Sequence, residues 1–428
     1  MTITASPVEP TAALSTLPPE AKAKFSAALA EKEGKGRPQD DVSELRGLIP
    51  HVLQALHTNK MWESVTEAEE ISCEQFKGDY TSKSHIGILT PRSTEESPVV
   101  VKFESKALHR GTTAFKINPQ LVEIHQLLSD QGLATTLLAV SRDKDSVPNF
   151  TVESIGVCYF DEEESCTDGY WDTVNSETGA GGEMAKVAAR LHQKIPVQWF
   201  DKYRREIREL CPLMKDEADD SAMWVMMRTG ALAQARLAAK AGGTPFLNQK
   251  RAHAPSDEDV KQIADLLPRP RGEHASRVVT CHGDLWCANV VKDKRSGQTV
   301  LIDLEGVVVS YAATEFAQFA SRGVCRIYLE TLMEDTGSVP TEEDIDRFWL
   351  EVLIAGYVQG EILRPTCWED AEWNETSTSK MIAHVQRFSL YVKKMRNDSE
   401  LCQQVLRKAS QDEPWCSDEV MDLVLGKA

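Results

Sequence analysis

The stretch of sequence that decides the fold is Val278-Val279-Thr280-Cys281-His282-Gly283-Asp284-Leu285-Trp286-Cys287-Ala288-Asn289-Val290-Val291, followed by Val300-Leu301-Ile302-Asp303-Leu304-Glu305-Gly306. In the first run an apolar strand leads into a His-Gly-Asp turn, and Asn289 comes five residues after Asp284. The second run is another apolar strand, and it ends on Asp303, nineteen residues after Asp284. Three polar side chains thus follow two segments whose residue types are typical of buried strands.

These three side chains are the types that phosphoryl transfer from a nucleotide requires. A carboxylate must orient the attacking hydroxyl and accept its proton, and oxygen ligands must hold the Mg²⁺ ions that neutralise the phosphate charge. We expect Asp284 to be the base and Asn289 and Asp303 to be the magnesium ligands, with Gly283 allowing the sharp turn that projects the base. The alternative is a coincidental strand–turn–strand unit with solvated carboxylates, and three matched polar positions argue against it.

The pattern His-Gly-Asp-x4-Asn with Ile-Asp-x-Glu resembles the aminoglycoside phosphotransferase and choline/ethanolamine kinase family, whose members share the protein-kinase fold. Gly283 stands where choline kinases usually have Asn, whereas Glu305 resembles the choline-kinase side of the family. The resemblance covers about residues 70–330 and is specific at 278–306. It implies an α/β (α+β) fold with two lobes, and transfer of the γ-phosphate of ATP, with Mg²⁺, to a hydroxyl of a small acceptor.

Hydrophobic periodicity along the chain fits two such lobes. We expect residues 1–40 to form a flexible lead, and 41–156 to form an N-lobe with a small antiparallel sheet and one helix at 121–132. Its strands are expected at 70–76, 85–90, 98–103, 136–140 and 150–155, after a helix at 41–57. Residues 157–428 form a larger, mainly helical C-lobe, with the strands 277–281 and 299–302 around the catalytic and metal loops. Its helices are expected at 183–193, 199–210, 221–241, 257–267, 311–333, 341–363 and 379–395.

The resemblance also implies an ion pair in the N-lobe. Lys102 ends a Val-rich strand and is positioned like the lysine that contacts the α- and β-phosphates of ATP. Glu123, early in the following helix, is its expected partner, and Lys106 is a competing lysine. Each could instead be an ordinary solvated side chain, but their order and spacing match the family pattern.

Two further segments are expected at the nucleotide. The turn at 77–84 would cover the phosphates with Gly78, backbone N–H groups and the hydroxyls of Thr81 and Ser82. The strand at 150–156 resembles the hinge whose backbone meets the adenine, which implies contacts from Glu153 and Ile155.

Acceptor selectivity in this family comes from the C-terminal helices. There the aromatic and acidic residues Trp368, Glu369 and Trp373, with Glu305 from the metal loop, suit a cationic small molecule through cation–π attraction and charge pairing. Choline or ethanolamine is the first expectation, an aminoglycoside or another metabolite hydroxyl the second. A nucleotide-binding pseudokinase that acts as a scaffold is the alternative of another class.

Composition limits the other possibilities. The chain of 428 residues has 66 acidic and 48 basic residues, a net charge of −18, which disfavours nucleic acid and anionic membranes and favours cationic partners. No segment approaches the ~18–20 apolar residues that span a bilayer, and no secretory signal is recognisable at the N-terminus. We therefore expect a cytoplasmic protein that binds ATP and a small molecule. The Cys281-His282-x4-Cys287 run lacks the second ligand pair of a zinc site, so buried thiols are the preferred interpretation.

Overall fold

The computed structural model describes residues 40–75, 85–93, 95–103, 119–141, 150–158, 179–200, 257–286, 289–304, 307–317, 321–359 and 375–411. Residues 1–39, the expected helix at 221–241 and nearly all of that at 199–210 lie outside these ranges. Within them, no helix is long and apolar enough to cross a membrane.

The first part of the described chain is a five-stranded antiparallel sheet. Its strands are β1 (Ile71–Gln75), β2 (His85–Pro91), β3 (Val99–Phe103), β4 (Leu137–Ser141) and β5 (Phe150–Ser154), in the spatial order β1-β2-β3-β5-β4. In β3 the buried side chains Val99, Val101 and Phe103 alternate with half-buried ones, so Lys102 lies on the opposite face of the sheet from the core residues.

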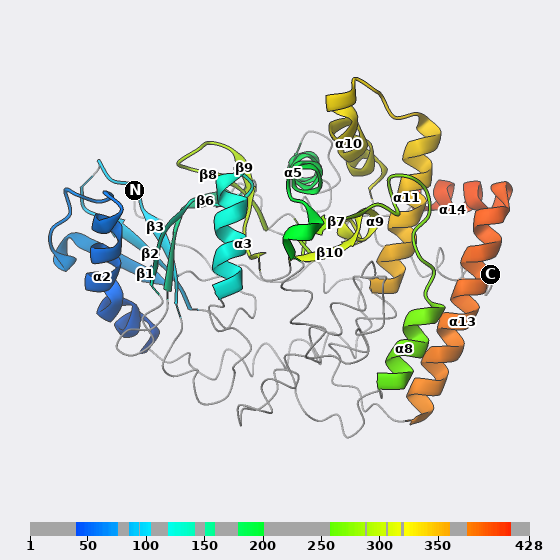
Figure 1. Cartoon of the computed structure of the whole chain (residues 1–428), viewed down its shortest axis with the longest axis horizontal. Coiled ribbons are helices and arrows are strands. Elements are labelled where there is room, and N and C mark those ends of the chain that lie inside the picture. The colour runs from blue at the N-terminus through cyan, green and yellow to red at the C-terminus, as the bar shows by residue number, and fades with distance from the viewer. Residues whose placement is uncertain are drawn as a thin grey trace.

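Helices lie on both sides of this sheet (Figure 1). Helix α2 (Asp40–Thr58) buries Leu45, Val52 and Leu56 at helical spacing in one hydrophobic core with the sheet, and the 3-10 helix η1 (Ala68–Glu70) leads into β1. Helix α3 (Pro119–Asp130) lies on the other side, toward the rest of the molecule (Figure 1). Its Ile124 and Leu128 belong to the second, larger hydrophobic core.

Two small sheets follow. Strand β6 (Gly156–Cys158) starts two residues after β5 and pairs with β8 (Val290–Asp293), which also pairs with β9 (Thr299–Leu301). Strand β7 (Val278–Cys281) pairs with β10 (Val308–Tyr311). The sequence analysis expected β7 and β9 but not β6, β8 or β10, although all five strands have only three or four residues.

The remaining described elements are mostly helical. They are α5 (Ala180–Lys194), η4 (Val197–Phe200), α8 (Asp257–Leu266), α9 (Ala312–Glu315), α10 (Arg322–Met333), η8 (Glu334–Thr336), α11 (Glu342–Tyr357), α13 (Glu375–Asn397) and α14 (Ser399–Gln411). The single helix expected at 311–333 is wrong: β10, α9 and α10 occupy this segment. The reason is local, because the Ser321 hydroxyl caps a new helix start by accepting from the Val324 N–H.

Candidate active site

The His-Gly-Asp turn follows β7 directly. Gly283 has φ of 80°, a left-handed conformation that a side chain disfavours, and the turn leaves Asp284 exposed. The strand before the turn is fixed, because Val279 and Cys281 are buried and Thr280 donates to the Ile195 carbonyl at 3.1 Å. A rigid strand therefore presents an accessible carboxylate.

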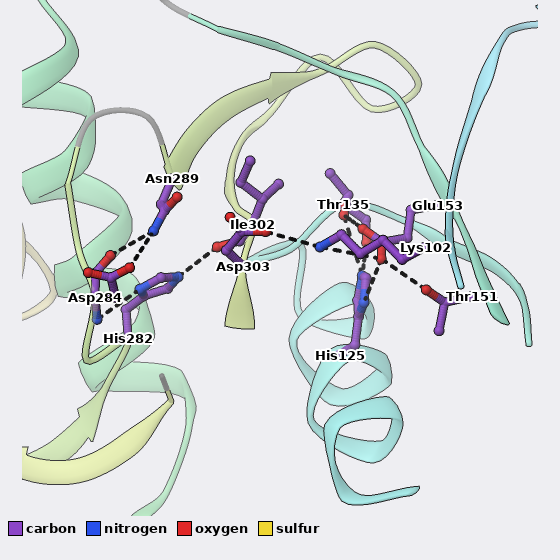
Figure 2. Close-up of polar contacts among 10 residues, drawn as sticks. All are labelled: Lys102, His125, Thr135, Thr151, Glu153, His282, Asp284, Asn289, Ile302 and Asp303. Carbon is purple, nitrogen blue, oxygen red and sulfur yellow. Dashed lines mark hydrogen bonds and ion pairs between the residues drawn. The ribbon is translucent and has the colours of Figure 1, made fainter. Parts of the chain in front are cut away.

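His282 links the two motifs. Its Nδ1 accepts from the Asp284 N–H at 3.3 Å, and its Nε2 lies 2.8 Å from the carbonyl oxygen of Ile302. These partners define the tautomer, because Nε2 must carry the proton to donate to a carbonyl. His282 is completely buried, so it holds the Asp284 turn at a fixed place beside the residue that precedes Asp303 (Figure 2).

Asn289, the residue before β8, contacts the same turn. Its side-chain nitrogen donates to the Asp284 carbonyl at 2.8 Å and to the Asp284 carboxylate at 3.3 Å. Figure 2 shows that the amide oxygen points away from Asp284. The Asn289 carbonyl also accepts from the Ile302 N–H at 3.0 Å, which joins this loop to the end of β9.

Asp303 has a strained backbone. Its φ of 55° is left-handed, which only a few per cent of non-glycine residues adopt and which Asp tolerates better than most. Such outliers cluster at functional sites, where the surrounding structure holds them in place. The side chain is 42% exposed and its Oδ1 lies 3.2 Å from Nζ of Lys102.

Lys102 therefore contacts Asp303 of the second run, although the two residues are 201 positions apart in the sequence. Its Nζ lies between two carboxylates, 3.2 Å from Asp303 and 3.8 Å from Glu153 (Figure 2). The structure thus brings together Lys102, Asp303, Asn289 and Asp284, the four residues that the sequence placed at the centre of the site.

The expected ion pair between Lys102 and Glu123 is not formed. Glu123 lies on the exposed face of α3, while Val122, Ile124 and His125 are buried. The helix is rotated so that His125, two residues later, faces the lysine site, with Nδ1 3.6 Å from the Glu153 carboxylate.

The expected contact of the Glu153 backbone with adenine also needs correction. Strand β5 is central at this point, and Glu153 pairs with Val100 on one side and Leu137 on the other, so its backbone faces sheet partners. Its side chain instead lies beside Lys102. The Ile155 carbonyl accepts from the Lys294 N–H at 3.0 Å, and a carbonyl has a second lone pair for another donor.

A buried network lies beneath the Asp284 turn. The Glu315 carboxylate accepts from the backbone N–H groups of His282, at 2.6 Å, and Gly283, at 3.2 Å, and its Oε2 lies 3.2 Å from His192 Nε2. Burial alone would raise the pKa of Glu315, but the hydrogen bond and charge of His192, with the contacts of His282, hold it below its usual value.

His192, Cys281 and Glu315 could geometrically surround a metal ion, since their ligand atoms lie within 4.8 Å of one another. Their chemistry does not fit one. His192 Nδ1 is bonded to the Tyr328 hydroxyl at 2.8 Å, and Glu315 already accepts two backbone N–H groups. Burial raises the pKa of the Cys281 thiol well above its usual value, so Cys281 is the buried thiol that the sequence predicted.

Several expected site residues lie outside the described part of the chain. They are Gly78, Thr81 and Ser82 of the phosphate turn, the alternative lysine Lys106, Cys287, Glu305 after the metal loop, and the acceptor residues Trp368, Glu369 and Trp373.

The profile of the family described as "Phosphotransferase enzyme family" matches residues 92–348, more than half of the chain. The chain belongs to this family. The fold class expected from the sequence is thereby confirmed: the phosphotransferase has a protein-kinase-like architecture, an antiparallel sheet followed by a mainly helical part. It is an enzyme that transfers a phosphoryl group to an alcohol hydroxyl.

The phosphotransferase is also similar to solved structures at low identity. One is a Plasmodium vivax ethanolamine kinase, with 11% identity and a TM-score of 0.44, covering 76% of this chain and 83% of the kinase. Another is a macrolide 2'-phosphotransferase from Brachybacterium faecium, with 12% identity, a TM-score of 0.37, and coverage of 74% and 92%. No curated protein matches significantly. Values this low indicate nothing about the acceptor.

Two residues of the phosphotransferase site were not predicted to act there. His282 was quoted as part of the turn, but its bond to Ile302 depends on how β7 and β9 come together. Glu315 is 32 residues from Gly283, in a segment that the sequence analysis assigned to a longer helix. An acidic residue inside the mostly apolar run Ala312 to Phe316 was the signal that could have found it.

Proposed function

We propose that the chain is an ATP-dependent small-molecule kinase that transfers the γ-phosphate to a hydroxyl of a small, amine-bearing acceptor. One observation carries the proposal: a lysine from the sheet lies 3.2 Å from the strained Asp303, which is joined through Ile302 and His282 to the exposed Asp284. Three groups therefore lie close together: a cation that can bind phosphate, a carboxylate that can bind metal, and a carboxylate that can accept the proton of the acceptor.

Each residue has a role that fits its surroundings. Lys102 binds the α- and β-phosphates, and Asp284 orients the acceptor hydroxyl and accepts its proton. Asn289 keeps Asp284 in place, because its side-chain nitrogen bonds to that residue in two ways.

Asp303 and Asn289 fit a magnesium site chemically. Both offer oxygen, the ligand type that Mg²⁺ prefers. The Asp303 carboxylate is partly exposed, and the Asn289 amide oxygen points away from Asp284 (Figure 2). When bound, Mg²⁺ neutralises phosphate charge during transfer.

The amine-bearing acceptor is proposed from charge and composition. The net charge of −18 favours cationic small molecules, and Trp368, Glu369 and Trp373 offer aromatic faces with a carboxylate for an ammonium group. Choline or ethanolamine is the first candidate, and aminoglycosides are the second.

The test measures ADP release with Mg-ATP across choline, ethanolamine, aminoglycosides and sugar metabolites. We expect turnover on an amine-bearing acceptor, and a fall in kcat of about 10²- to 10⁴-fold in Asp284→Asn, with ATP affinity retained. Asp335→Asn is the matched control, because Asp335 is an exposed aspartate on η8. ATP binding without turnover on any acceptor would favour the scaffold alternative. Wild-type turnover in Asp284→Asn would remove Asp284 from the mechanism.

A further inference from the structure

Glu153 is an acidic side chain with an unusual position in the sheet. It is 3% exposed and lies on β5, next to Thr151, which pairs with Lys102 of β3. Alternation along β5 places Glu153 and Thr151 on one face, the face that also carries Lys102. A carboxylate is rarely buried without compensating partners, so the contacts of Glu153 indicate what holds it there.

Those contacts account for both oxygens. Oε1 lies 3.8 Å from Lys102 Nζ, 3.6 Å from His125 Nδ1 and 3.3 Å from the donating Thr151 hydroxyl. Oε2 accepts from the Thr135 hydroxyl at 3.0 Å. Burial would raise the pKa of Glu153, but Lys102, His125 and the two hydroxyls outweigh burial and hold the pKa below its usual value. Glu153 is therefore ionised at neutral pH.

His125 connects this carboxylate to helix α3. Its Nε2 lies 2.8 Å from the carbonyl oxygen of Thr135, so the ring is fixed between the α3–β4 connection and Glu153. Helix α3 thus meets the lysine site through His125, while Glu123 is exposed. Thr135 contributes twice, through its carbonyl to His125 and through its hydroxyl to Glu153.

We infer that Glu153 is the positioning residue for Lys102, and that it takes the place expected of Glu123 on α3. Glu153 and Asp303 attract the same ammonium group, and Glu153 is fixed by buried partners, whereas Asp303 is 42% exposed. Glu153 therefore holds Lys102 at the edge of the site and limits its collapse onto the Asp303 carboxylate. The inference rests on the proposed function, in which Lys102 binds the phosphates of ATP.

The test is a double-mutant cycle with Glu153→Gln and Lys102→Met. The Gln side chain has nearly the same shape, and the two threonine hydroxyls can rotate to accept from its amide, so the change removes mainly the charge. Glu153→Asp, which keeps the charge but shortens its reach, is a second variant in case Gln is poorly tolerated. Glu123→Gln is the matched control, because it removes a carboxylate two residues before His125 on the exposed face of α3.

Each protein is titrated with Mg-ATP by calorimetry and unfolded with urea. We expect Glu153→Gln to weaken ATP binding about tenfold, within the range of coupling between contacting residues. We expect Glu123→Gln to leave binding unchanged. The double variant should bind no more weakly than Lys102→Met alone, because Glu153 acts through that lysine. The urea cycle should show coupling between the two positions.

Other outcomes distinguish the positioning role of Glu153 from the kinase proposal. Wild-type ATP affinity in Glu153→Gln, or additive losses in the double variant, would overturn the positioning role while leaving the kinase proposal intact. Coupling in urea unfolding alone would reduce Glu153 to a structural partner and equally overturn the role. A wild-type protein that binds no ATP would refute the kinase proposal, and the positioning role with it.

Discussion

Glu315→Gln tests the network beneath the Asp284 turn. The change is nearly isosteric, but it replaces one carboxylate oxygen by an NH₂ group in a side chain with 0% exposure. Oε2 accepts from the His282 N–H and contacts His192, and Oε1 accepts from the Gly283 N–H. Whichever way the amide is turned, its NH₂ group faces a backbone donor.

The magnitude follows from these contacts. A buried N–H left without an acceptor costs about 1–3 kcal/mol, and removing one partner of a buried charged pair costs about 3–5 kcal/mol. We take the first range, because the Gln oxygen can stay at the His282 N–H and His192, which leaves only the Gly283 N–H without an acceptor. At about 1–2 °C per kcal/mol for a chain of 428 residues, the Tm should fall by about 1–6 °C.

Turnover should fall as well, because the turn carries Asp284. Misplacing a catalytic group by about 1 Å can cost about 10²-fold in rate. We therefore expect kcat to fall about 10- to 100-fold well below the Tm, with the KM for ATP nearly unchanged. Thermal melts and ADP release measured on one preparation test both effects. Glu330→Gln, an exposed position on α10, is the matched control.

The pH dependence gives a further check. The pKa of Glu315 is below the usual value of 4.5 in the folded protein. The carboxylate therefore stabilises the fold fully above pH 4.5, and this contribution is lost as the pH falls through the lowered pKa. The Tm difference between wild type and Glu315→Gln should narrow under those acidic conditions. A variant that melts at the same temperature as the wild type and keeps its kcat would refute the reasoning.

Four further changes test the metal residue and the helical packing. Asp303→Ala should abolish magnesium-supported turnover and leave the melt intact, because this partly exposed side chain follows a strand end; near-normal turnover would contradict the assignment. Arg396→Met should cost about 3–5 kcal/mol in urea unfolding, because it leaves Glu351 of α11 buried without its partner, and changing Glu351 to Leu as well should recover stability. Gly356→Ala should cost about 1–3 kcal/mol, because the new Cβ would lie 2.7 Å from the Ala317 carbonyl. Gly47→Ala, with nothing within 4 Å, should instead stabilise α2 by up to about 1 kcal/mol; equal effects would refute the packing argument.

The centre of the site was predictable because its signals are local. Asp284 and Asp303 each follow a short apolar run, and Asn289 is tied to Asp284 by a spacing of five residues. Local sequence signals alone therefore predicted these residues as a group, and the structure places them together with Lys102. Their catalytic and metal-binding roles stay predictions.

The partner of Lys102 was not predictable in the same way. Glu123 and His125 are about 200° apart around the helix axis, so they lie on nearly opposite faces of α3, and the choice between them depends on which face of α3 packs on the sheet. Glu153 was expected to act through its backbone, and only the pairing of β5 with strands on both sides excludes this. The orientation of α3 and the pairing of β5 both depend on how segments pack against one another, and the spacing of residues in one sequence does not specify that packing.

The strand pairing that connects β5 to the rest of the molecule limits how the site can open. The Lys294 N–H bonds to the Ile155 carbonyl, and the Leu301 N–H bonds to the Leu133 carbonyl at 2.8 Å, two residues before Asp303. Lys102 and Asp303 therefore lie on opposite sides of these two backbone hydrogen bonds. The two residues cannot separate widely unless the hydrogen bonds break. Amide hydrogens at Lys294 and Leu301 would exchange with solvent only during such separations. The exchange rates of these two amides would therefore measure how often the sheet and the metal loop separate, without any substrate being present.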